Sequence, residues 1–410
     1  MEINFDEMTD RRNTSSLKWD VNDGELPMWV ADMDFKTAPE IINAISEKAA
    51  QGIFGYSTVS YEWQDSIINW WKRRHSFNID RNWLIFCTGI VPAITSSIKR
   101  VTNIGDSILV LTPAYDIFYH SIENSGRHVL ECPLNYDSDS LSYSIDFVSL
   151  EKKLSYPLTT MMILCNPQNP SGNLWSAGEL SLIGELCDKH HVTVLSDEIH
   201  CDITSPGFAY TPFASVSKLN ADISITCISA SKAFNLAGLQ SAAAVIPNDA
   251  LRENINRGLN SDEIAEPNSF AICSAAAAFN YGEKWLDSLN KYIYENKKAL
   301  DAFLKENLPD VRMVPSDSTY LAWLDCSEYN GKINIPYLIS EINGDASSES
   351  DLLKIYLRHN TGLYLCSGSV YRGNGASFLR MNIACPKQRL SDGLNRLKIG
   401  LTSLYNSKVL

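Results

Sequence analysis

Lys232 lies in the segment 229–235 (SASKAFN), and Asp197 precedes it by 35 residues, in the segment 196–200 (SDEIH). A lysine amine can form a Schiff base with the aldehyde of a cofactor, and a carboxylate can keep a pyridine nitrogen protonated. The pair therefore predicts pyridoxal phosphate chemistry, in which the protonated ring accepts electrons from the substrate's Cα. A solvated surface lysine and a carboxylate that caps a helix are the alternatives for each residue taken alone.

Small polar residues near these motifs suit the other parts of such a cofactor. Gly89 lies between a predicted strand and a predicted helix, where backbone N–H groups can turn toward an anion. Ser229 and Ser231 offer hydroxyl donors for a phosphate. The segment 166–172 (NPQNPSG) combines two prolines that fix the backbone with two asparagines, one of which can reach a phenolate oxygen.

Two larger side chains complete the candidate site. Tyr115 can stack on a planar cofactor, although a tyrosine in the core is the ordinary alternative. Arg380 is a charge inside the apolar run 378–384 (FLRMNIA). A desolvated arginine needs a partner, and a substrate carboxylate or a structural ion pair would supply one.

The composition is that of a globular protein that binds neither nucleic acid nor membrane. The chain has 410 residues, enough for two domains, with 45% hydrophobic and 20% charged residues. A net charge of −13 disfavours nucleic acid and anionic lipid as partners. The acidic start has no apolar signal-peptide core, and no apolar run is long enough to span a membrane. Ten scattered cysteines without a CxxC pair indicate reduced thiols in the cytoplasm.

Hydrophobic periodicity predicts alternating strands and helices between residues 80 and 250. The expected strands cover residues 85–87, 107–111, 161–165, 192–195 and 223–228. This alternation predicts an α/β fold with a mostly parallel sheet and helices on both faces. Ligands bind at the carboxyl ends of the strands in such sheets, and the polar motifs all follow apolar runs.

A second, smaller domain is expected after about residue 285. A long helix over 285–304 leads there to mixed strands and helices around 320–325 and 378–384. We expect three parts: an N-terminal segment 1–50 that contributes to the small domain, a large cofactor-binding domain 51–285, and a C-terminal small domain 286–410.

The motifs resemble the fold-type I pyridoxal phosphate enzymes of the class I/II aminotransferase superfamily. The finer resemblance is to the MalY/PatB-like cystathionine β-lyase branch, and it covers nearly the whole chain. It is carried by the segments 17–20 (LKWD), 28–35 (MWVADMDF), 52–56 (GIFGY), 196–200 (SDEIH), 231–239 (SKAFNLAGL), 319–325 (TYLAWLD) and 379–386 (LRMNIACP). The resemblance implies a large domain with a mostly parallel seven-stranded sheet flanked by helices, and a small α+β domain.

The resemblance also implies a role for each candidate residue. Lys232 would bind pyridoxal 5′-phosphate covalently and move the Cα proton, with Tyr115 stacking on the ring and assisting catalysis. The other implied cofactor contacts are Gly89, Ile90, Val91, Asn169, Asp197, His200, Ser229, Ser231 and, from the neighbouring subunit of a homodimer with shared active sites, Tyr56. The implied substrate contacts are Arg380, for the carboxylate, together with Asn169, Trp29, Val30, Ala31 and Asp32.

Some positions depart from the aminotransferase pattern. His200 stands where aspartate-aminotransferase-like enzymes have tyrosine, and Gln240 stands where they have an arginine facing the phosphate. Both fit the lyase branch. Ser367-Gly368 replaces the Pro-Gly of the branch, and the segment 370–375 (VYRGNG) is individual, so the preferred side chain of the substrate stays open.

The predicted reaction is β-elimination from L-cystathionine or another cysteine S-conjugate, which yields a thiol, pyruvate and ammonia. A thiolate leaves more easily than an alkoxide because it is far less basic. An aminotransferase with a 2-oxo acid acceptor is the first alternative, and a regulatory protein that retains the cofactor is the second.

Two further classes of enzyme are disfavoured. A metal hydrolase built on His190, His191, Asp197 and His200 lacks the HExxH spacing, so no metal is expected. A nicotinamide enzyme would need a third glycine beside Gly373-Asn374-Gly375.

Overall fold

A seven-stranded sheet organises the larger part of the molecule. The structure is a computed structural model that describes residues 3–332 and 347–406. The strands follow the order β2-β10-β9-β8-β7-β3-β4. Their bounds are β2 (Leu84–Cys87), β3 (Ser107–Thr112), β4 (His128–Pro133), β7 (Thr159–Cys165), β8 (Thr193–Asp197), β9 (Ser224–Ile228) and β10 (Ala242–Val245). All neighbours pair in parallel except β10, which is antiparallel to β2 and β9. The predicted mostly parallel sheet is confirmed.

Helices cover both faces of this sheet because its strands bury side chains alternately on each side. Ile108 and Val110 of β3 join the core beneath α3 (Ile90–Val101), α4 (Asp116–Asn124) and α8 (Asp249–Ser261). Leu109 and Leu111 join a separate core beneath α5 (Phe147–Leu154) and α6 (Ala177–Lys189). Each parallel strand therefore ends between two helical layers, at an edge where loops can converge.

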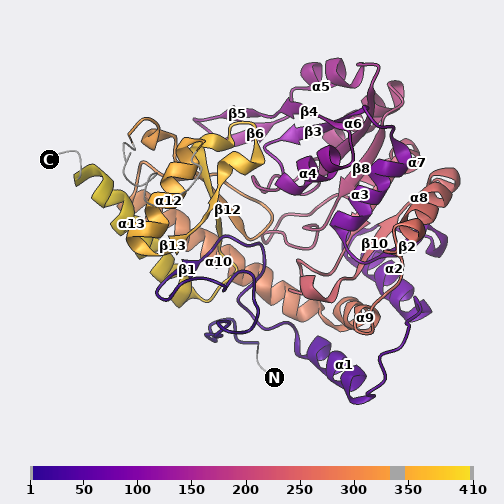
Figure 1. The fold of residues 1–410 in the computed structure, drawn as a ribbon, viewed down its shortest axis with the longest axis horizontal. Coiled ribbons are helices and arrows are strands. Elements are labelled where there is room, and N and C mark those ends of the chain that lie inside the picture. The colour runs from indigo at the N-terminus through magenta and orange to yellow at the C-terminus, as the bar shows by residue number, and fades with distance from the viewer. Residues whose placement is uncertain (1–2, 333–346, 407–410) are drawn as a thin grey trace.

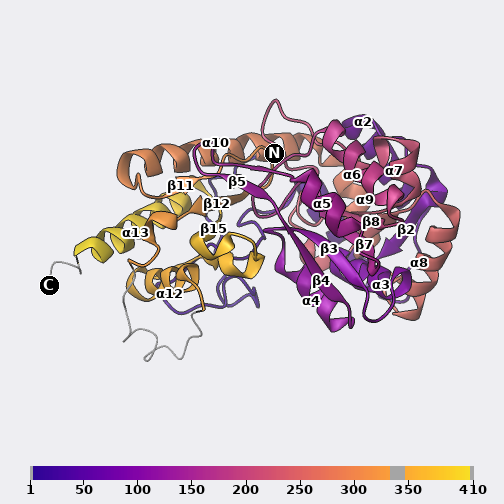
Figure 2. The same cartoon turned by 90° about the horizontal axis from the view of Figure 1, so that it is seen from above.

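A smaller antiparallel sheet lies toward the C-terminus, at the other end of the molecule from the large sheet (Figures 1 and 2). Its order is β11 (Arg312–Met313), β12 (Leu321–Asp325), β15 (Phe378–Asn382) and β14 (Cys366–Ser367). The helices α12 (Glu349–Thr361) and α13 (Lys387–Asn406) lie beside it. The helix α10 (Glu283–Asn307) runs from the large sheet toward this part (Figure 2).

The N-terminal segment contacts both parts. Its strand β1 (Leu26–Pro27) pairs in parallel with β13 (Leu363–Tyr364), whereas its helix α1 (Pro39–Ala50) contacts α9 (Ala271–Tyr281), next to α2 (Tyr61–His75). The expected boundary at residue 285 falls in the first turn of α10. The three-part division at residues 50 and 285 stays a prediction.

All ten cysteines are unpaired thiols, and most are buried, as expected of reduced core residues. Within residues 3–332 and 347–406, no helix is both long and apolar enough to cross a bilayer.

Gly368 allows two loops of the smaller part to touch. A Cβ at this position would lie 2.2 Å from the carbonyl oxygen of Gly375 and 2.4 Å from that of Phe378. Backbone cannot move aside as a flexible side chain can, so Gly368→Ala should lower the free energy of unfolding by about 2 kcal/mol. Chemical denaturation would measure it. Gly178→Ala, in the exposed first turn of α6 with ample space around it, is the matched control and should not destabilise the protein.

Candidate active site

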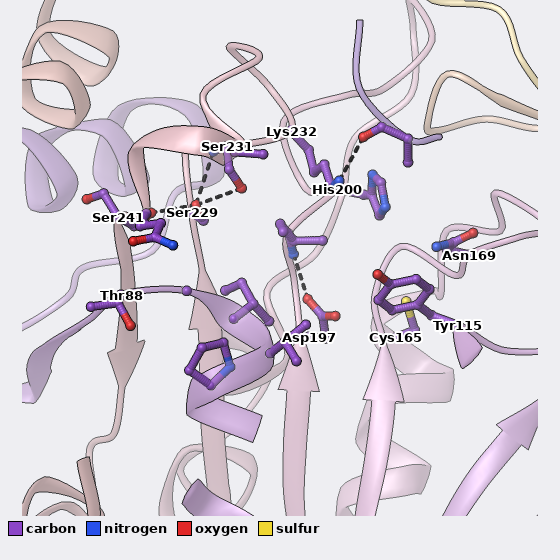
Figure 3. A pocket seen from close by; sticks show the side chains of 18 residues that line it. Thr88, Tyr115, Cys165, Asn169, Asp197, His200, Ser229, Ser231, Lys232 and Ser241 are labelled. Carbon is purple, nitrogen blue, oxygen red and sulfur yellow. Dashed lines mark hydrogen bonds between the residues drawn. The ribbon is translucent and has the colours of Figure 1, made fainter. Parts of the chain in front are cut away.

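A cavity of about 210 Å³ lies at the carboxyl ends of β7, β8 and β9. The loops after these strands deliver the predicted motifs to one place, as a parallel sheet requires. The cavity is lined by Ala31, Thr88, Gly89, Ile90, Val91, Pro92, Tyr115, Cys165, Asn169, Asp197, Ile199, His200, Ser229, Ser231, Lys232, Ala237, Gln240 and Ser241. Figure 3 shows that Lys232, His200, Asp197 and Tyr115 surround one common space.

Lys232 points into this cavity from the loop after β9. Its Nζ donates a hydrogen bond to the carbonyl oxygen of Ala31 at 2.7 Å. The side chain keeps some access to solvent through the cavity, but the surrounding protein removes most water from the amine. This desolvation, helped by the nearby Arg380 cation, lowers the pKa of Lys232 to about 8, against the opposing influence of Asp32 and Asp197. A substantial fraction of the amine is therefore neutral and nucleophilic near pH 8.

Asp197 ends β8 at the floor of the cavity. Its Oδ1 accepts a hydrogen bond from the backbone N–H of Ile199 at 3.1 Å. Burial raises the pKa of Asp197 to about 7. No lysine, arginine or histidine nitrogen of the described residues lies within 4.0 Å of this carboxylate. A protonated pyridine nitrogen would supply the missing cation, so this end of the cavity fits pyridoxal 5′-phosphate.

His200 remains neutral beside Lys232 (Figure 3). Burial, together with the positive charges of Lys232 and Arg380, lowers the pKa of His200 to about 3. Its Nδ1 is buried without a hydrogen-bond partner among the described residues. An imidazole at this position can therefore serve a ligand as a neutral polar contact but not as an acid.

The other end of the cavity is built for an anion. The helix α3 begins there, directly after Gly89, and directs free backbone N–H groups and its positive dipole end toward the space. Ser229, Ser231, Thr88 and Ser241 gather at the same end (Figure 3). The hydroxyl of Ser229 bonds to the carbonyl oxygen of Ser241 at 2.7 Å, whereas the buried Ser241 hydroxyl has no partner among the described residues. A phosphate would satisfy that hydroxyl.

Sequence reasoning missed some of the lining. It did not single out Thr88, Pro92, Cys165, Ile199, Ala237 or Ser241 for the site, and it treated Gln240 only as a departure from a pattern. Thr88 and Cys165 adjoin predicted strand ends, which is the one signal that could have found them. Ser241 directly precedes β10, and it reaches the site because β10 runs antiparallel to β9. No local sequence pattern predicts that pairing.

Arg380 lies on β15 just beyond this cavity and is 5% exposed. It donates to the side-chain oxygen of Asn169 at 3.3 Å and to the carbonyl oxygen of Trp29 at 2.9 Å. Its Nε is buried without a partner, and no carboxylate of the described residues forms an ion pair with it. The structural ion pair considered above is therefore absent from the described part of the chain, and the guanidinium is available to an anionic ligand.

The remaining predicted residues divide into two groups. Tyr115 and Asn169 line the cavity, and burial raises the pKa of Tyr115 to about 12, so its hydroxyl stays protonated. Trp29, Val30, Asp32 and Tyr56 do not line it. The first three belong to the segment that carries Ala31, and Tyr56 is fully exposed.

His190 and His191, considered above as ligands of a metal hydrolase, lie far from Asp197 and His200. His190 caps the C-terminal end of α6, and both His190 and His191 precede β8. They therefore lie at the opposite end of that strand from Asp197 and His200.

Comparison with known proteins identifies the family. Residues 26–397 match the family "Aminotransferase class I and II", and the chain belongs to this family. It is 40% identical over 407 residues to "Cystathionine beta-lyase PatB" of Bacillus subtilis (strain 168), covering 98% of this chain and 100% of that protein.

Solved structures agree with this assignment. A PLP-bound putative aminotransferase from Clostridium difficile 630 has a TM-score of 0.90 and 33% identity, covering 97% of this chain and 99% of that one. A PLP-bound C-S lyase from Staphylococcus hominis, complexed with the inhibitor L-cycloserine, has a TM-score of 0.87 and 32% identity, covering 98% and 99%. The fold is thus the fold-type I architecture predicted from the sequence.

The depressed pKa of Lys232 is directly measurable. In protein freed of bound aldehyde, pulse labelling of amines against pH, followed by peptide mass spectrometry, should show half-maximal reactivity of Lys232 near pH 8. Exposed lysines, which in water titrate near about 10.4, provide the internal reference. Half-maximal labelling of Lys232 at the pH of the exposed lysines would contradict the desolvated site.

Proposed function

We propose that this chain is a pyridoxal 5′-phosphate-dependent carbon–sulfur β-lyase that acts on L-cystathionine or related cysteine S-conjugates. The observation that carries the proposal is a desolvated lysine and a buried carboxylate in one cavity with a buried arginine just beyond it, the last two without an ion-pair partner among the described residues. The kinship with a cystathionine β-lyase and a C-S lyase supports the choice of reaction.

Lys232, Asp197, the start of α3 and the serines around it would hold the cofactor. When bound, pyridoxal 5′-phosphate supplies an electron-accepting ring that stabilises the negative charge left on Cα after its proton is removed. Asp197 would hold the ring nitrogen protonated, and Asn169 would contact the phenolate oxygen. Gly89, Ile90, Val91, Ser229 and Ser231 would contact the phosphate, with Ser241 as an added donor.

The substrate would be oriented by its carboxylate. Arg380 presents a planar guanidinium whose two terminal nitrogens donate to Asn169 and to the Trp29 carbonyl. This grip directs the Cα–H bond toward Lys232, whose amine accepts the proton as a general base. Protonated Lys232, the Tyr115 hydroxyl or water can then assist the departing sulfur. His200 stays neutral throughout and does not compete for the proton.

The reaction type is tested by the products. Purified protein with L-cystathionine should release pyruvate and a free thiol without any 2-oxo acid acceptor, and Lys232→Ala should abolish this because the general base is lost. Lactate dehydrogenase coupling and a thiol reagent would measure both products. Turnover that requires an acceptor and yields no pyruvate would show an aminotransferase instead. A panel of S-substituted cysteines would then define the accepted leaving groups.

We also propose a homodimer with shared sites. Tyr56 is fully exposed, and its neighbours Ile53 and Phe54 are 76% and 57% exposed. Such an apolar stretch before α2 is costly in water and suits burial against a second copy. Tyr56 would then reach the phosphate of the neighbouring subunit's cofactor. The ten unpaired cysteines suit a reducing compartment such as the cytoplasm.

Shared sites predict complementation between two defective chains. Lys232→Ala and Tyr56→Ala should each be impaired alone, but a mixed dimer would contain one intact site. Random pairing of equal amounts should restore about a quarter of the wild-type activity. Co-expression followed by the pyruvate assay measures this, and sedimentation analysis confirms the dimer. No recovery in verified mixed dimers would contradict a site shared through Tyr56.

A further inference from the structure

Residues 29–33 pass the active site as an irregular segment, with bends at residues 30–32, outside any strand. They make no backbone–backbone hydrogen bond among the described residues, although Met28 and Asp34 on either side do. Side chains from distant elements bind their carbonyl oxygens instead. The Ala31 carbonyl accepts from Lys232 at 2.7 Å and from the Tyr320 hydroxyl at 2.9 Å. The position of the amine therefore depends on a segment that no sheet ladder holds.

The same segment also helps to position Arg380, the proposed binding group for the substrate carboxylate. The Trp29 carbonyl accepts from Arg380, while Asn382 binds the carbonyl oxygens of Val30 and Asp32. A shift of this segment would thus move the hydrogen-bond acceptors of the two cations at the centre of the reaction, Lys232 and Arg380.

A charged cluster fixes the far end of the segment. It consists of Arg11, Lys18, Asp32, Asp34 and Arg389. Lys18 is fully buried, and its Nζ lies 3.1 Å from Asp34, 3.6 Å from the Asp32 carboxylate and 3.3 Å from the Asp32 carbonyl oxygen. Arg11 pairs with Asp32 at 2.7 Å and with Asp34 at 3.1 Å, and it also donates to the Met33 carbonyl at 3.0 Å. Arg389 approaches Asp34 at 3.0 Å.

We propose that Lys18 and Arg11 are positioning residues for proton transfer, because they clamp residues 32 and 33 and thereby hold the Ala31 carbonyl as the acceptor that orients the Lys232 amine. Neither side chain lines the cavity, so both act through the segment. The amine must be free to take the Cα proton while its remaining hydrogens are held, and the Ala31 carbonyl supplies that hold. The inference rests on the proposed function only in assigning Lys232 as the base.

The charge balance of the cluster makes the idea testable. Three cations surround two carboxylates, so loss of Lys18 leaves two of each and no unpaired buried anion. Lys18→Met keeps the length of the side chain and removes the contribution of Lys18 to the clamp, whereas Lys18→Arg restores a cation.

The experiment follows hydrogen exchange at Cα of L-alanine in D₂O, measured by NMR with the cofactor-loaded enzyme. Alanine has no leaving group at Cβ, so the exchange reports proton transfer by Lys232 whether or not β-elimination occurs. Lys18→Met should slow the exchange at saturating alanine at least tenfold, and Lys18→Arg should recover most of the rate. The substrate KM should change less than the exchange rate, since Asn169, which lies outside the segment, still accepts from Arg380.

A second readout does not depend on turnover. The absorbance of the bound cofactor changes with pH as the nitrogen of Lys232 gains or loses a proton, and Arg380, Asp32, Asp197 and His200 are the groups that face it. Loss of the Lys18 charge and release of Asp32 both change the charges near the nitrogen of Lys232, so the midpoint should move away from the wild-type value in Lys18→Met. Rescue by Lys18→Arg should return it.

Lys297→Met is the matched control. Lys297 is also buried and bonded to carbonyl oxygens, those of Ser316 and Ser318, but it does not touch residues 29–33. It should lower thermal stability while leaving the exchange rate and the absorbance midpoint in place. If Lys18→Met does not fold, Arg11→Met with Arg11→Lys as its rescue serves instead, since Arg11 is partly exposed.

The outcomes separate the two proposals. Unchanged exchange and midpoint in folded Lys18→Met, or equal losses in Lys297→Met, would overturn the positioning role. Slowed exchange in Lys18→Met, in an enzyme that gives no pyruvate from cystathionine, would reject the β-lyase assignment and keep the positioning role. Absence of exchange in the wild-type enzyme would overturn the positioning role as well.

Discussion

The active site depends on buried charges that the protein leaves without direct partners. Lys232, Asp197 and Arg380 lie in one desolvated region, yet none of them forms an ion pair with another side chain among the described residues. Burying an unpaired charge is expensive, and proteins usually pair such groups or neutralise them. Here the pKa values of Lys232 and Asp197 move toward the neutral forms instead. A cofactor and an amino-acid substrate offer the complementary charges, so binding relieves a cost that folding imposed.

The two sheets together hold these three charged side chains in the buried region. Asp197 and Lys232 follow neighbouring strands, β8 and β9, of a sheet covered by helices on both faces. Arg380 comes from β15 of the smaller sheet, and Asn169 after β7 joins the two parts by accepting from it. The segment 29–33 contacts both parts and offers backbone carbonyl oxygens to Lys232 and Arg380. Carbonyl oxygens can hold a cation without neutralising it, which leaves Lys232 and Arg380 reactive.

The side chains around Lys232 determine which group can transfer protons in the cavity. Neutral His200 and protonated Tyr115 provide polarity without further charge, so Lys232 is the group best suited to exchange protons with Cα. The end of the cavity beside the start of helix α3 carries neutral hydroxyls, and Gln240 contributes a neutral amide to the lining. These features suit elimination of a good leaving group such as a thiolate, because nothing more acidic than Lys232 or Tyr115 is required to assist it.

The sequence by itself determined the parallel sheet, the fold type and several of the residues that line the cavity. Buried strands appear as short apolar runs, and the carboxyl edge of a parallel sheet brings the loops after them together, so Lys232, Asp197, Asn169 and Tyr115 could be found from local patterns. Arg380 stood out because a charge interrupts an apolar strand. Only the tertiary structure decided that β10 reverses to deliver Ser241, that Arg380 has no carboxylate partner among the described residues, and that Lys18 and Arg11 contact the segment beside Lys232. These relations join residues up to hundreds of positions apart, and their energies depend on distance and burial, which no local spacing encodes.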